Sequence, residues 1–152
     1  KLVLISVILH DTGWAHVDED RILSEGFGAD WRNAQIRFEH EEQGCIVARR
    51  VLTELGYPEE FISQVNAIID GHDTRREAHS LEDCLMRDAD RLWRFDHAGV
   101  ALGAIWFGKT PAWYLDTLER EIVPELTTEA GKAMALAEHA RATALLVTDI
   151  LR

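Results

Sequence analysis

The sequence contains few cysteines and no long apolar segment. Cys45 and Cys84 are its two cysteines, and neither belongs to a Cys-x-x-Cys pair. This scarcity argues against a disulfide scaffold and favours a reducing compartment, so we expect a cytoplasmic protein. The longest apolar run, Leu2 to Leu9, is interrupted by Ser6. It is far shorter than the roughly 20 residues that cross a bilayer, and no small-residue cleavage site follows it as after a signal peptide.

Basic residues are also in short supply. The chain has 16 Lys and Arg against 27 Asp and Glu, which leaves a formal net charge of -11. No Lys/Arg-rich stretch is present to neutralise phosphates, so nucleic acid and anionic membranes are poor partners. The hydrophobic fraction of 47% is too high for a disordered chain. We therefore predict one globular domain over residues 1–152.

The hydrophobic pattern is helical throughout, and no alternating strand pattern interrupts it. Gly56 has the position of a helix C-cap, and Pro58 that of a first helical residue. Ser80 begins a variant capping box, and Thr110-Pro111 an N-terminus. The sequence predicts an all-α bundle of about six or seven helices. The expected segments are 1–9 (the end of a helix), a short helix near 18–25, 33–55, 58–71, 80–95, the short apolar segment 99–108, 110–123 and 128–151.

Three of these helices have a predicted buried face. Two of the faces carry a histidine among apolar residues, which is unusual enough to examine for function. The predicted faces are His40, Gly44, Val47, Val51 and Leu55; Phe61, Val65, Ile68 and His72; and Ala133, Leu136, Ala140, Ala144, Val147 and Leu151.

Imidazoles and carboxylates recur where burial is expected. His10 and Asp11 follow the first apolar run, His40 and His72 lie on buried faces, and Asp90 borders an apolar side of its helix. These groups are ligands for Zn, Fe, Mn or Ni. Taken singly, each has an ordinary explanation, such as a helix terminus or a hydrogen-bonded core histidine. The two carboxylates of Asp88-Ala-Asp90 also fit a solvated face paired with neighbouring arginines.

Taken in order, these motifs resemble the HD superfamily of metal-dependent phosphohydrolases over about residues 2–100. The motifs are His10-Asp-Thr-Gly13, His40-Glu41, Ile68-Ile-Asp-Gly-His72 and Asp88-Ala-Asp-Arg-Leu92. The resemblance implies an all-α fold, which agrees with the helical pattern. It also implies one or two divalent ions (Mn, Fe, Ni, Co, Mg or Zn). The implied ligands are His10, Asp11, His40, His72 and Asp90.

The resemblance also implies roles for individual carboxylates. Asp11 would bridge two ions, Glu41 would orient a ligand or solvent, and Asp88 would have a supporting or structural role. In that family a first ligand histidine lies upstream of the doublet, whereas residues 1–9 contain no histidine. We therefore expect an N-terminally incomplete domain; otherwise the first position lacks a ligand, or water or a partner chain fills it. Gly56-Tyr57-Pro58 matches a tripeptide of the cyclic-di-GMP phosphodiesterase branch, but we interpret it as a cap and turn.

A phosphate substrate also requires cations. Arg37, one turn before His40, and Arg91, next to Asp90, are the first candidates. Arg32, Arg75 and Arg76 are the others, and ordinary salt bridges are the alternative for all five. Trp14 could stack on a base or close a pocket, although core packing is its more common role. Trp106, Trp113 and Tyr114 could line the pocket, with core packing or a homodimer contact as the alternative.

The sequence thus predicts a metal-dependent phosphohydrolase that cleaves a nucleotide or related small phosphoester by metal-activated water. The expected catalytic residues are Asp11, Glu41, Arg37 and Arg91. Two alternatives stay open. One is an HD-type di-iron oxygenase acting on a small organic substrate, and the other is a non-catalytic binding module whose site has decayed.

Overall fold

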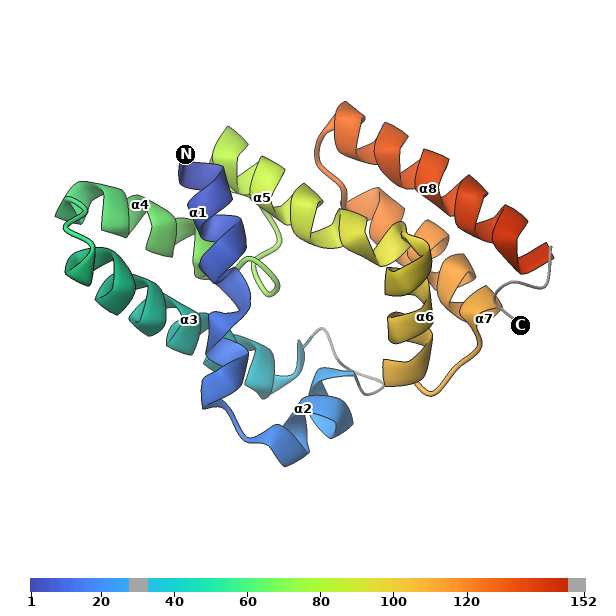
Figure 1. Cartoon of the computed structure of the whole chain (residues 1–152), viewed down its shortest axis with the longest axis horizontal. Helices are drawn as coiled ribbons and strands as arrows, with labels where there is room; N and C mark the ends of the chain where they lie inside the picture. Colours follow the sequence, from blue (N-terminus) through green and yellow to red (C-terminus); the bar gives the residue numbers. More distant parts are fainter. Residues whose placement is uncertain (28–32, 148–152) are drawn as a thin grey trace. The chain divides into compact units, whose positions relative to one another are not determined.

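A computed structural model describes residues 1–27 and 33–147 of the chain (Figure 1). Over these residues it consists of eight α-helices joined by short 3-10 and π segments, with no strand. The predicted all-α class is confirmed. The chain divides into two compact units, Lys1–Met86 and Arg87–Arg152, whose boundary falls inside one helix. The prediction of one domain over residues 1–152 stays a prediction, and each unit is described by itself.

The first unit is built around two long helices that follow each other in the chain. The helix α3 packs against the 3-10 segment η1 and against α4, while α1 packs on α4. Its elements are α1 (Leu2–Leu9), η1 (His10–His16), α2 (Glu19–Gly26), α3 (Gln35–Glu54), α4 (Glu59–Ile69) and the first part of α5 (Leu81–Leu92).

The core of the first unit lies between α3 and α4. Its buried residues are Ala48, Leu52, Ile62, Val65 and Ile69. Partly buried residues of α1, among them Leu2, Ile5 and Leu9, pack against this cluster. Burial of this apolar surface is the main contribution to the stability of the unit.

The burial of two helices in this unit differs from what their sequences suggest. In α3 the buried face runs through His40, Gly44, Ala48 and Leu52 at a constant spacing of four residues. The predicted continuation through Val47, Val51 and Leu55 is wrong, and Leu55 is 67% exposed. Helix α1 is a helix as expected, but Ser6 is its one fully buried residue. Partners on adjacent helices cover only one side of α1, so an all-apolar sequence does not ensure burial.

Local signals at the helix ends are reproduced closely. Gly56 follows α3 with a φ of 74°, and the backbone N–H of Tyr57 donates to the carbonyl of Leu52. This is the bond expected of a glycine-terminated helix. Pro58 occupies the N-cap of α4 rather than its first residue. The Ser80 hydroxyl accepts a bond from the backbone N–H of Asp83, as a capping residue does.

The second unit contains three further helices. They are α6 (His97–Trp106), α7 (Pro111–Thr117) and α8 (Glu129–Val147), with the short segments η3 (Trp93–Phe95), η4 (Leu118–Ile122) and η5 (Val123–Glu125) between them. Thr110 caps α7 by accepting from the N–H of Trp113, as predicted. Among residues 1–27 and 33–147, no helix combines the length and apolar character that crossing a bilayer requires.

The predicted buried face of α8 is wrong. Gly131, Ala135 and Ala142 are buried, whereas the predicted Ala133, Leu136, Ala140 and Ala144 are exposed. The helix is rich in alanine on all sides, so its sequence alone does not single out one face. The predicted Leu151 and the side chain of Val147 lie outside the described residues.

Candidate metal centre

Three segments of the first unit bring histidines and carboxylates together. His10 and Asp11 lie in η1, His40 lies in α3, and His72 and Asp73 lie in the turn after α4. His10, Asp11 and His72 form one group that could hold a metal ion, and His40, His72 and Asp73 form another. Segments separated by about sixty positions therefore converge on one place, as the sequence predicted for His10, Asp11, His40 and His72.

The Asp11 carboxylate lies among the three imidazoles. Its Oδ1 is 3.6 Å from Nε2 of His40 and 3.7 Å from Nε2 of His72, and its Oδ2 is 3.2 Å from Nε2 of His10. Two ligand atoms that bind the same ion, each at about 2.1 Å, lie roughly 3 to 4 Å from each other. The Asp11 distances to His40 and His72 exceed hydrogen-bond length and match this ligand spacing.

Backbone carbonyls fix the orientation of two imidazoles. Nδ1 of His10 is 2.8 Å from the carbonyl oxygen of Val7, and Nδ1 of His72 is 2.8 Å from that of Ile69. A carbonyl oxygen can only accept, so Nδ1 carries the proton in each ring. In the neutral imidazole the Nε2 lone pair then faces the carboxylates. This is how proteins commonly orient a metal-binding histidine.

His40 is fully buried, with 0% of its surface exposed. Neither of its ring nitrogens has a hydrogen-bond partner among the described residues. A buried polar atom without a hydrogen bond costs about 1–3 kcal/mol. Its Nε2 lies 3.6 Å from Asp11 and 3.9 Å from Asp73. A cation held between these groups would remove that cost.

The electrostatic surroundings keep Asp11 ionised. Burial raises the pKa of this carboxyl, but the neighbouring imidazoles of His10, His40 and His72 lower it more. The net pKa lies well below the ordinary range. The Asp11 side chain is nevertheless 52% exposed, so one side of the carboxylate is open to solvent or a ligand. An anionic, accessible carboxylate among neutral imidazoles is suited to binding a divalent ion.

Glu41 supports the turn that carries His72. Its Oε1 accepts from the backbone N–H groups of Asp73 and Thr74 at 2.8 and 3.0 Å, and its Oε2 accepts from the Thr74 hydroxyl at 2.7 Å. The side chain is 2% exposed. Both oxygens are therefore used inside the protein, which gives Glu41 a positioning role.

Arg37 does not have the geometry expected of a phosphate-binding residue. Its Nη1 is 2.5 Å from Oδ2 of Asp73, and its Nη2 donates to the carbonyl of Gly26 at 2.9 Å. The residue is 4% exposed. The expected contact with a substrate phosphate does not fit this position, because the guanidinium is buried and engaged with protein oxygens.

Asp73 is the site residue that sequence reasoning missed. Its Oδ2 lies 3.9 Å from Nε2 of His40 and 4.0 Å from Nε2 of His72. The sequence does contain a signal for Asp73. The tripeptide His-Asp-Thr occurs both at residues 72–74 and at residues 10–12, where its His and Asp are predicted ligands.

The remaining predicted residues of the site belong to the second unit. Asp88 accepts from the backbone N–H groups and hydroxyls of Thr127 and Thr128 and so fixes the segment just before α8. The Thr128 hydroxyl in turn caps α8 by accepting from the N–H of Gly131. Asp90 forms an ion pair with Arg94 at 3.1 Å, and its role as a metal ligand stays a prediction. Nε of Arg91 donates to Glu125 at 3.3 Å.

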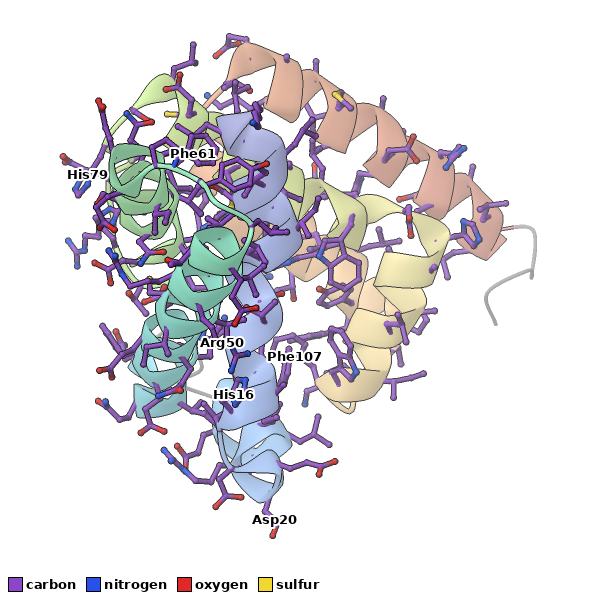
Figure 2. All side chains as sticks on the ribbon, turned by 60° about the vertical axis from the view of Figure 1, so that its left-hand side comes forward. His16, Asp20, Arg50, Phe61, His79 and Phe107 are labelled. Atoms are coloured by element: carbon purple, nitrogen blue, oxygen red, sulfur yellow. The ribbon has the colours of Figure 1, made fainter. Side chains whose placement is uncertain are left out.

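Several other candidate side chains have ordinary surroundings. Arg75 pairs with Asp83 at 2.6 Å, and Arg76 is exposed. Arg32 lies outside the described residues. His16 and His79, which lack a supporting pattern in the sequence, are exposed on the first unit (Figure 2).

Comparisons with protein-family models, with curated proteins and with solved structures found no match for this chain. The resemblance to HD phosphohydrolases therefore rests on the motifs, and the chemistry rests on the cluster just described.

Proposed function

We propose that this chain is a metal-dependent phosphohydrolase that cleaves a nucleotide or related small phosphoester with metal-activated water. The observation that carries the proposal is the position of Asp11. Its carboxylate lies within 3.7 Å of Nε2 atoms from three histidines that come from different segments. Such a set of donors has no evident structural purpose, because it places a buried polar cluster beside the core.

The donor set fits a transition-metal ion better than magnesium. Imidazole nitrogens suit Mn, Fe, Co, Ni and Zn, while Mg prefers an octahedron of oxygens with several waters. His10, His40 and His72 would hold the ion or ions through Nε2, and Asp11 would bind through both oxygens. Asp73 adds a carboxylate on the other side of His40 and His72.

A bound divalent ion supplies two effects, a lowered pKa of coordinated water towards about 7 and neutralisation of phosphate charge. The protein's own residues supply the geometry. The carbonyls of Val7 and Ile69 hold the imidazoles of His10 and His72 in one tautomer. Glu41 holds the turn of His72 and Asp73, and the open side of Asp11 leaves access for substrate. Preorganised groups of this kind need little rearrangement during reaction.

The test is metal-dependent phosphate release. The protein is stripped with a chelator, reloaded separately with Mn²⁺, Fe²⁺, Co²⁺ or Ni²⁺, and assayed on nucleotides and simple phosphoesters. We expect activity with at least one ion and its loss in His40→Gln and His72→Gln. His79→Gln is the matched control, because His79 is exposed and lies outside the cluster. Stoichiometric metal without hydrolysis of any phosphoester would reject the hydrolase.

A second candidate, the di-iron oxygenase, is favoured by one specific observation. The two groups, His10-Asp11-His72 and His40-His72-Asp73, together offer three histidines and two carboxylates. Imidazole and carboxylate are the ligand types of non-haem iron, and this number of donors is enough for two ions. Anaerobic loading with Fe²⁺ followed by oxygen-uptake measurements separates the candidates. Oxygen consumption that depends on an organic substrate supports the oxygenase, and phosphate release with Mn²⁺ supports the hydrolase.

A further inference from the structure

Trp14 contacts two members of the metal centre at once. Its indole ring stacks on the His40 imidazole, with ring centroids 4.0 Å apart and an interplanar angle of 11°. Its Nε1–H donates a hydrogen bond to Oδ1 of Asp11 at 3.1 Å. Oδ1 is also the oxygen that faces Nε2 of His40 and of His72. One side chain thus constrains both a buried imidazole and the carboxylate beside it.

The fold holds the indole in place from another side. A Cβ built on Gly26, at the end of α2, would lie 3.5 Å from the tip of the Trp14 ring. Trp14 itself lies in η1, three residues after Asp11, so its N–H reaches the carboxylate across one turn. The ring therefore fills the space between η1, α2 and α3.

We infer that Trp14 is a positioning residue that sets the metal affinity of the centre. The inference rests on the proposed metal centre and names a residue that controls it. The indole N–H occupies one lone pair of Asp11 Oδ1 and leaves the other for an ion. Partners of this kind, which orient a ligand without touching the metal, typically change metal affinity by about 10- to 100-fold.

Stacking acts in the same direction as the hydrogen bond. The face of an indole ring is electron-rich and attracts positive charge. An imidazole that binds a cation carries part of the positive charge, so the indole stabilises the metal-bound form of His40 over the metal-free form. The parallel arrangement also covers one face of His40 and keeps water away from it.

Two substitutions separate the contributions. Trp14→Phe keeps an aromatic face for His40 but removes the N–H donor to Asp11, and Trp14→Leu removes both. With Co²⁺ alone as the probe, measured by competition with a chelator, we expect about 10-fold weaker binding for Trp14→Phe. For Trp14→Leu we expect up to about 100-fold. Tyr57→Phe, also in the first unit, is the control and should bind Co²⁺ like the unsubstituted protein, because the Tyr57 ring stacks on Phe61 and not on a member of the cluster.

Spectroscopy provides a readout that a purely structural role would not change. Co²⁺ quenches nearby tryptophan, so the quenching amplitude should fall in Trp14→Phe and persist in Tyr57→Phe, which keeps Trp14. The visible Co²⁺ spectrum should shift in Trp14→Phe, because the Asp11 ligand loses its fixed orientation. Circular dichroism establishes that each variant is folded, and Trp14→Phe decides the question if Trp14→Leu does not fold.

The outcomes distinguish this inference from the function it rests on. If the unsubstituted protein binds no Co²⁺, the metal centre is wrong and the role of Trp14 is wrong with it. If it binds Co²⁺ and Trp14→Phe has the same affinity, spectrum and quenching, the metal centre stands and the role of Trp14 is rejected.

Discussion

Gly13 lies directly against the backbone of His40. A Cβ built on Gly13 would come within 1.8 Å of the His40 carbonyl oxygen and 2.5 Å of the backbone nitrogen of Gly44. Both contacts are with backbone, which cannot rotate away as a side chain can. This close approach of η1 to α3 is what brings Asp11 to His40.

Gly13→Ala should therefore separate the two halves of the centre. The added methyl group forces η1 away from α3, and overpacking of this kind costs about 1–3 kcal/mol or more. We expect a lower free energy of unfolding and at least 10-fold weaker Co²⁺ binding, measured by chemical denaturation and calorimetry. Gly56→Ala is the control. It is strained by its φ of 74° but has open space around it, so stability should fall while Co²⁺ affinity stays unchanged.

Asp73→Asn tests whether this carboxylate is a ligand. Removing its charge should weaken Co²⁺ binding by at least 10-fold, because Oδ2 lies about 4 Å from Nε2 of His40 and of His72. Titration calorimetry of the folded variant measures this. Asp70→Asn is the matched control, since Asp70 is exposed in the same turn. Equal affinities in the two variants would show that Asp73 serves only to pair with Arg37.

Arg37→Met should change stability and metal affinity in opposite directions. Arg37 is 4% exposed, and its guanidinium neutralises the Asp73 carboxylate. Breaking such a buried pair destabilises a protein by about 3–5 kcal/mol. The released carboxylate should attract a cation more strongly, so we expect tighter Co²⁺ binding in a less stable metal-free protein. Arg76→Met, at an exposed position, should change neither quantity. Weaker binding in Arg37→Met would contradict this electrostatic competition.

Cys45 should be nearly inert towards alkylation. Burial, with lesser contributions from the charges of Asp70 and Glu41, raises the pKa of its thiol well above the ordinary range, to about 12. At pH 8 the thiolate fraction then falls about a thousandfold, since each unit is a factor of ten. Iodoacetamide labelling of a Cys84→Ser variant, followed by mass spectrometry, measures the rate. The denatured variant is the control and should react at the rate of a free thiol.

The same shift makes stability depend on pH. The native thiol stays protonated while the unfolded thiol ionises, so the stabilisation is complete below the unfolded pKa near 9. It is lost as the pH rises from about 9 towards 12. Cys45→Ala should flatten this part of the curve of unfolding free energy against pH. An identical slope in the variant would rule out the buried thiol as its cause.

Asp88→Ala should destabilise the second unit without changing the first. The carboxylate is 3% exposed and accepts four hydrogen bonds from Thr127 and Thr128 at the start of α8. Removing a buried acceptor and leaving its donors unsatisfied typically costs about 1–3 kcal/mol. We expect a loss in that range by denaturation and unchanged Co²⁺ affinity. Asp116→Ala, an exposed partner of Arg120, should cost under about 0.5 kcal/mol.

The local structure of this chain was predictable from its sequence. Gly56, Ser80 and Thr110 mark helix ends because each supplies a backbone conformation or a hydrogen bond that a helix terminus needs. The grouping of His10, Asp11, His40 and His72 was expected only because the ordered motifs resemble the HD superfamily, since each residue taken singly has an ordinary explanation. The signals at the helix ends are of another kind. These signals act over a few residues and are readable one segment at a time.

Tertiary structure decided which helix faces are buried and which residues from distant segments meet. The predictions of the buried face of α8 and of the C-terminal part of the buried face of α3 were wrong. A helix with apolar residues on several sides is oriented by the elements that pack against it. Asp73 lies in the centre and pairs with the buried Arg37 because the turn after α4 packs beside α3. The contact of Gly13 with His40 likewise joins residues 27 positions apart. Such contacts follow from packing in three dimensions, which no single segment encodes.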